Sequence, residues 1–129
     1  MEITFEGGKV VSANTRGFKI LTDQPLQNGG TETAPSPFDY YLASIGTCAG
    51  IYVKSFCDNR HIPTDGIKII QKTVFNEETD LPVRLTIEIQ LPADFPEKYR
   101  ASVISVAELC KVKKSIINPP VFEVKAITR

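Results

Sequence analysis

Apolar and polar residues follow two different periods along this chain of 129 residues. Several short stretches are apolar or alternate between apolar and polar residues, which predicts β-strands, because successive side chains of a strand point to opposite faces. Gly7-Gly8 and the segment NEETDLP predict the turns of two hairpins between such stretches. The predicted strands lie at residues 3–5, 9–13, 17–22, 66–74, 83–91 and 121–127.

A long stretch between the third and fourth strands has helical spacing instead. Ser36 and Pro37 suit the start of a helix, and Asp39 follows the serine by three residues, as in a capping box. Apolar residues then recur at positions 38, 41, 42, 45, 48, 49, 52, 53 and 56, and others lie on the remaining sides. A helix that is apolar on nearly all sides must be covered on most of them. We therefore predict a central helix that ends near residues 58–62.

Two further helices complete the pattern. One begins at residues 94–97 and runs to about Glu108, and the other covers KVKKSII and stops at Asn118-Pro119-Pro120. The order is three strands, a helix, two strands, two helices and a strand. Because strands and helices do not alternate singly, the predicted class is α+β. The length suits a single domain over residues 1–129.

Composition excludes several classes of partner. The formal net charge is +0, so nothing indicates binding to nucleic acid or to an anionic membrane. The longest uncharged stretch, residues 40–53, is too short to span a bilayer. The N-terminus lacks a basic region followed by an apolar run, so we expect a cytoplasmic protein. Because cytosolic thiols are kept reduced, we do not expect the three cysteines to form structural disulfides.

Two of these cysteines are the candidates for chemistry. Cys110 precedes three lysines at an expected helix start, where amides and ammonium groups stabilise a thiolate. Cys48 lies between Gly46 and Gly50 in the central helix, and each glycine costs about 1 kcal/mol relative to alanine. A helix accepts that cost where another part of the chain or a substrate comes close. The alternative for both cysteines is a small buried core residue.

Cys57 and His61 are the remaining candidates. Cys57 continues the apolar face of the central helix, which favours a structural role. Cys57 and His61 are four residues apart and could share a metal ion, but a single pair without a second one nearby does not make a zinc site. We therefore predict no metal and no cofactor.

Two segments resemble motifs of the OsmC/Ohr family. TDQPLQNGGTETAPSPFDYYLASIGTC is similar to the first motif, in which Asp-Glu-Pro, Gly-Gly and Pro-Ser-Pro lead to Gly-x-Cys, and AELCKVKKSI is similar to the second. The resemblance covers nearly the whole chain and is closest to the broad OsmC-like subgroup. It implies a two-layer fold with curved antiparallel sheets around central helices. It also implies an intertwined homodimer with active sites at the interface.

The resemblance further implies a reaction. Cys48 corresponds to the peroxidatic thiol and Cys110 to the resolving thiol, so the chain would reduce organic hydroperoxides through a sulfenic acid and a Cys48–Cys110 disulfide. A dithiol reductant would reset the pair. The characterised peroxidases carry a glutamate ten residues before the first cysteine, where this chain has Phe38. Asp39 follows and is either the counterpart of that glutamate or only the helix cap. Arg16 lies in the region of the family's arginine, at a shorter spacing to Cys48.

A peroxidatic thiol also needs a cation and a water-poor pocket. Arg16 is the first candidate for the cation and Lys111 the second, with Asp39 orienting whichever is used. We expect the cation to be essential, because Cys48 is inside a helix, where the dipole contributes little. The pocket would be formed by side chains on the helical face of Cys48, namely Phe38, Tyr41, Ile45 and Tyr52.

A second hypothesis is a non-catalytic dimer whose cleft binds a small apolar ligand or senses oxidation. The state of Cys48 distinguishes the two, since a peroxidase needs a thiolate near neutral pH and a core cysteine does not.

Overall fold

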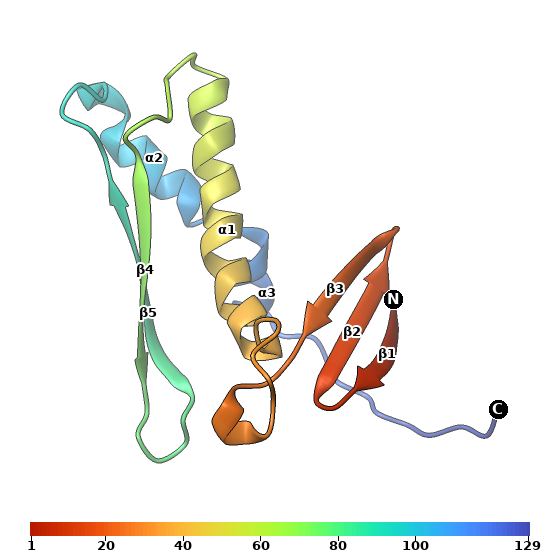
Figure 1. The fold of residues 1–129 in the computed structure, drawn as a ribbon. Coiled ribbons are helices and arrows are strands. Elements are labelled where there is room, and N and C mark those ends of the chain that lie inside the picture. The colour runs from red at the N-terminus through yellow and green to blue at the C-terminus, as the bar shows by residue number, and fades with distance from the viewer. The chain divides into compact units, whose positions relative to one another are not determined.

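The computed structural model describes residues 1–129, which form two units, Met1–Ser44 and Ile45–Arg129 (Figure 1). The class is α+β, as predicted, with antiparallel sheets and three α-helices. None of the helices has the length and hydrophobicity needed to cross a bilayer. The prediction of a single domain remains a prediction.

The first unit contains a three-stranded antiparallel sheet in the order β1-β2-β3. Its strands are β1 (Glu2–Gly7), β2 (Val10–Thr15) and β3 (Phe18–Thr22), which confirms the three predicted N-terminal strands. Gly7 and Gly8 both have positive φ, at 109° and 56°, so the β1–β2 turn uses a conformation that glycine adopts without strain. One face of the sheet is apolar and open, and Phe5 on it is 88% exposed.

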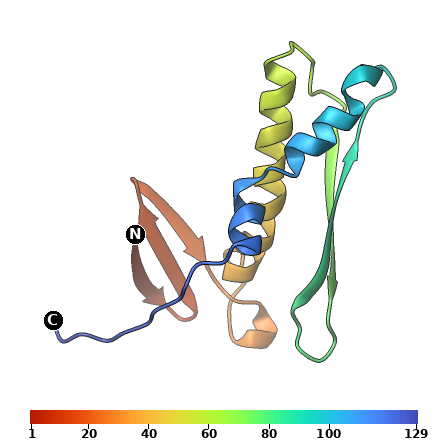
Figure 2. The ribbon, with the colours of Figure 1, turned by 180° about the vertical axis from the view of Figure 1, so that it is seen from behind.

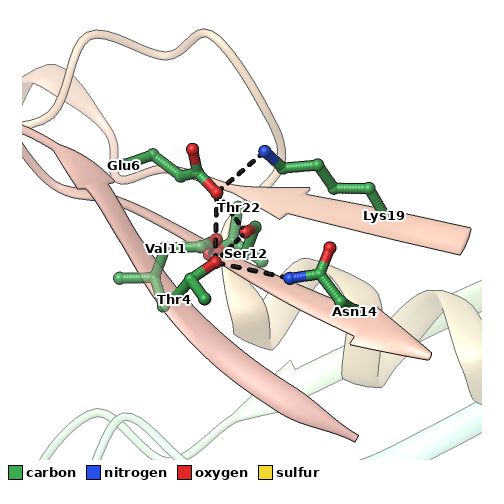
Figure 3. A network of polar contacts seen from close by, with 7 residues as sticks. All are labelled: Thr4, Glu6, Val11, Ser12, Asn14, Lys19 and Thr22. Carbon is green, nitrogen blue, oxygen red and sulfur yellow. Dashed lines mark hydrogen bonds and ion pairs between the residues drawn. The ribbon is translucent and has the colours of Figure 1, made fainter.

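The opposite face of this sheet carries a polar network (Figure 3). The buried Ser12 hydroxyl donates to Glu6 Oε1 at 2.5 Å, and Lys19 Nζ lies 2.8 Å from the same oxygen. Thr4 also donates to this carboxylate, and Asn14 donates to Thr4. These donors, Lys19 foremost, lower the pKa of Glu6 to about 2.

Asp23 organises the loop that leads from β3 to the first helix. Its side chain is buried and accepts hydrogen bonds from the backbone N–H groups of Gln24, Thr31 and Thr33 and from both threonine hydroxyls. The shortest joins Thr33 Oγ1 to Asp23 Oδ2 at 2.7 Å. These bonds, led by that of the Thr33 hydroxyl, hold the pKa of Asp23 well below its usual range. One carboxylate therefore fixes a loop that contains only a short 3-10 turn, η1 (Leu26–Asn28).

The helix α1 (Pro37–Asp58) begins in the first unit and ends in the second. Both of its ends agree with the prediction. In the second unit the hairpin of β4 (Lys68–Phe75) and β5 (Pro82–Gln90) runs beside α1, and α2 (Arg100–Ala107) packs with them (Figure 1). A short turn, η2 (Glu97–Tyr99), precedes α2, and α3 (Lys111–Ile117) follows it. The core of this unit is formed by Ala49, Val53, Phe56, Cys57, Phe95, Val103, Ala107 and Cys110.

The prediction of a last strand at residues 121–127 is wrong for the single chain. The segment after α3 has no secondary structure (Figure 2). A strand requires a neighbouring strand for its backbone hydrogen bonds, and no strand pairs with this segment. Its apolar side chains are therefore left in solvent, with Val121 at 97% and Val124 at 96% exposure.

Candidate functional site

The start of α1 is a capping box. The Asp39 N–H donates to Ser36 Oγ at 3.1 Å, and the Ser36 N–H donates to Asp39 Oδ2 at 2.9 Å. Two N-terminal amides are thus satisfied reciprocally, as the sequence predicted. Asp39 is therefore a cap, and its second role, orienting a cation, remains a prediction. The Phe38 and Tyr41 rings lie 5.2 Å apart on the same turns.

Cys48 meets the beginning of α3. Figure 2 shows α3 next to α1, and the backbone N–H groups of Val112 and Lys111 lie near the half-buried Cys48 sulfur. The neighbouring Cys110 side chain also contributes to lowering the pKa of Cys48. The Val112 amide is the main cause that lowers the pKa of Cys48, while burial opposes it. The sequence had indicated only a cation for this role, whereas backbone amides from another helix also contribute here, and the need for a cation remains a prediction.

The pKa of Cys110 is shifted in the opposite direction, upward. Its side chain is 1% exposed, and this burial is the main cause that raises the pKa of the thiol. The Lys113 N–H donates to Cys110 Sγ at 3.4 Å, but that bond is too weak to reverse the shift, and the neighbouring Cys48 adds to it. The sequence had suggested that the lysine-rich helix start favours a thiolate at Cys110, but in the folded chain burial raises the pKa of this thiol instead. The pair therefore combines a Cys48 thiol whose pKa is lowered with a Cys110 thiol whose pKa is raised.

Gly46 and Gly50 face β4. A Cβ added at Gly46 would lie 2.6 Å from Gln71 Oε1, and one added at Gly50 would lie 3.8 Å from Ile69 Cδ1. The glycines thus let the hairpin pack closely against α1. Of the two reasons that the sequence allowed for them, the approach of another part of the chain is the one observed.

Cys57 and His61 do not form a site. Cys57 is fully buried in the core, and burial raises its pKa. His61 is exposed in the turn after α1, at a φ of 54°. No cluster of three His, Cys, Asp or Glu side chains is arranged to hold a metal ion.

The predicted pocket residues have different surroundings. Tyr52 lines a groove of about 670 Å³ between α1 and α2, together with Phe56, Val106 and Leu109. Ile45 is buried, and its backbone oxygen lies 3.9 Å from Cys110 Sγ, which donates to it. The roles of these side chains toward a substrate remain predictions.

Arg16, the first candidate for the cation, is exposed in the turn between β2 and β3 at a φ of 49°. Arg16, Phe38, Asp39 and Tyr41 belong to the first unit, whereas both thiols belong to the second. The structure therefore brings Cys48 and Cys110 together with Lys111, whose charge contributes to lowering the pKa of Cys48. The backbone amides of Lys111 and Val112 were missed from the sequence. The sequence indicated only that a helix starts after Cys110. It did not indicate that the amides of this helix start lie near Cys48, because that requires knowing that the two cysteines are neighbours in the fold.

The family model described as "OsmC: OsmC-like protein" matches residues 29–125, a range that contains both thiols. The chain belongs to the OsmC-like protein family. A search of curated proteins finds no match.

Solved structures with the same fold come from several bacteria. A protein assigned to osmotic stress induction and detoxification response, from Psychrobacter arcticus 273-4, is 23% identical, with a TM-score of 0.74 over 88% of this chain and 85% of that one. An organic hydroperoxide resistance protein OsmC from Legionella pneumophila is 14% identical, with a TM-score of 0.54 over 89% and 87%. At these identities the likeness establishes the fold alone.

Proposed function

We propose that this OsmC-like protein is a thiol-dependent peroxidase that reduces organic hydroperoxides in defence against oxidative stress. The observation that carries the proposal is the contact of Cys48 with two backbone amides and with the thiol of Cys110. A reactive thiol requires thiolate character near neutral pH together with some exposure, and the lowered pKa and partial exposure of Cys48 both favour such a role. Names of structural neighbours, such as the hydroperoxide resistance protein of L. pneumophila, agree with this chemistry.

The reaction has two chemical steps. The Cys48 thiolate attacks the terminal oxygen of the hydroperoxide, the O–O bond breaks, and the alkoxide leaves as an alcohol after taking up a proton. Cys48 is then a sulfenic acid. The Cys110 sulfur attacks Cys48, the S–O bond breaks, and the hydroxyl leaves as water with the Cys110 proton, which leaves a Cys48–Cys110 disulfide. A dithiol reductant supplies the two electrons and two protons that restore both thiols.

The remaining roles come from the resemblance to the family. Arg16 would polarise the peroxide, with Asp39 orienting it, and Phe38, Tyr41, Ile45 and Tyr52 would surround the organic group. A homodimer would complete the site. The exposed apolar face of the first sheet and the unpaired residues 121–127 support a second copy, because monomers rarely leave so much apolar surface in water. Light scattering should give about twice the chain mass of 14.3 kDa.

The test measures consumption of an alkyl or aromatic hydroperoxide in the presence of a dithiol. Cys48→Ser should abolish it, and Cys110→Ser should allow about one turnover and then stall, because the sulfenic acid has no resolving partner. Arg16→Ala should lower the rate at least tenfold, which corresponds to about 1.4 kcal/mol of transition-state stabilisation. Lys9→Ala, which removes another exposed charge of the first unit, is the matched control and should leave the rate unchanged.

The outcomes separate the parts of the proposal. If Cys48→Ser consumes hydroperoxide as fast as the parent, the peroxidase proposal fails, and a dimer that binds an apolar ligand or senses oxidation becomes the better account. If only Arg16→Ala has no effect, the assignment of the thiols stands, and Lys111 becomes the candidate cation.

A further inference from the structure

The first turn of α3 depends on two sulfur atoms. Every helix leaves its first N–H groups without a backbone partner. In α3 the first backbone bond runs from the Lys114 N–H to the Cys110 oxygen, at 3.0 Å. In the first turn the Lys113 amide donates to Cys110 Sγ at 3.4 Å, and the amides of Lys111 and Val112 lie near Cys48 and lower its pKa. Cys110 is thus the N-cap of α3, a position normally taken by Ser, Thr, Asp or Asn.

Little else holds this turn in place. α3 has seven residues, none of which is fully buried, and Val112 is its one apolar side chain that packs against the core cluster. Isolated helices of this length are unstable in water. The order of the first turn therefore depends strongly on whether its amides keep their acceptors.

A disulfide changes both acceptors at once. The sulfur of Cys48 becomes part of a neutral disulfide and can no longer carry the negative charge that the Lys111 and Val112 amides favour. The S–S bond also fixes the two sulfurs at about 2.05 Å and constrains the side-chain torsions of Cys110. The Cys110 sulfur, which accepts from the Lys113 N–H at 3.4 Å in the reduced pair, is then held by Cys48 as well.

We propose that Cys110 has a second role as a redox-dependent cap: formation of the Cys48–Cys110 disulfide displaces the sulfur that caps the first turn of α3 and opens that turn. The inference rests on the proposed function, because a hydroperoxide supplies the oxidising equivalents and the two thiols supply the two electrons. The reduced pair keeps the turn closed, and the oxidised pair releases it together with the chain that follows.

Amide hydrogen exchange in the full-length protein, with and without one equivalent of cumene hydroperoxide, tests this. Oxidation should speed exchange at Lys111, Val112 and Lys113 at least tenfold. The β4–β5 hairpin should not change. Intact mass and peptide mapping report in the same samples whether the disulfide has formed.

Two substitutions at one position separate capping from redox chemistry. Cys110→Ser retains a good N-cap and cannot form the disulfide, so Lys113 should stay protected with and without hydroperoxide. Cys110→Ala has no cap, so its Lys113 amide should exchange fast in both conditions. Equal protection in these two variants would overturn the capping role. A mapped disulfide with unchanged exchange would overturn the inference and leave the proposed function intact. If no disulfide forms, the proposed function fails and the switch has no trigger.

Discussion

Replacing Gly46 or Gly50 with alanine tests why α1 carries two glycines beside Cys48. Alanine favours a helix interior over glycine by about 1 kcal/mol at either position. At Gly50 the new methyl group would lie 3.8 Å from Ile69 Cδ1, an ordinary contact, so the helical preference should be realised in full. We expect Gly50→Ala to raise the free energy of unfolding by about 1 kcal/mol.

Gly46 has a different neighbour. Its new methyl group would lie 2.6 Å from Gln71 Oε1, which is closer than such atoms can come. The Gln71 side chain must therefore move to make room. Forcing an extra methyl group into packed surroundings typically costs about 1–3 kcal/mol, so the gain from alanine should be cancelled or reversed. Gly46→Ala should therefore be less stable than Gly50→Ala by about 1 kcal/mol or more.

Urea denaturation of the reduced protein measures both values. The double variant Gly46→Ala/Gln71→Ala provides the decisive control, because removing the amide relieves the clash. Alanine at position 46 should then be more favourable than in the parent, and the double-mutant cycle should show coupling. Equal effects of alanine at both glycines, or a cycle without coupling, would refute the packing explanation. Gly50→Ala should also keep the parent's rate of hydroperoxide consumption, since this glycine faces β4.

Three further predictions follow from the same structure. At neutral pH, iodoacetamide should label Cys48 before the two buried cysteines. The labelling rate of Cys48, measured against pH, should have its midpoint below the ordinary thiol pKa of about 8.5, and a midpoint above that value would contradict the lowered pKa. NMR titration should give Glu6 a pKa of about 2, and Lys19→Ala should raise it. Because the folded pKa is depressed, the contribution of Glu6 to the free energy of unfolding is present above its unfolded pKa of about 4.3 and is lost as the pH falls toward 2. If Lys19→Ala leaves this loss of stability at low pH unchanged, the result argues against the ion pair. Phe56→Ala, which removes a buried ring from the core, should lower the free energy of unfolding by about 3–5 kcal/mol in denaturant titration, and a loss below 1 kcal/mol would contradict the assigned core.

Local patterns in the sequence were sufficient for most of the fold. The three N-terminal strands, the long helix with its capping box, the second hairpin and the two later helices all occur where periodicity and turn residues predicted them. Each of these signals acts within a few residues, so no knowledge of distant contacts was needed. The segment 121–127 shows the limit of such reasoning, because its strand-like pattern specifies a strand only when another strand is available to pair with it.

The sequence by itself determined that Cys48 lies in an apolar helix and that Cys110 precedes a short basic one. Only the tertiary structure decided what these positions mean. The lysines after Cys110 pointed to that residue as a thiolate, yet the folded chain buries it and turns the amides of Lys111 and Val112 toward Cys48. The physical reason is that a thiol's pKa depends on burial and on donors within hydrogen-bond distance, and here those donors come from a segment far away along the chain.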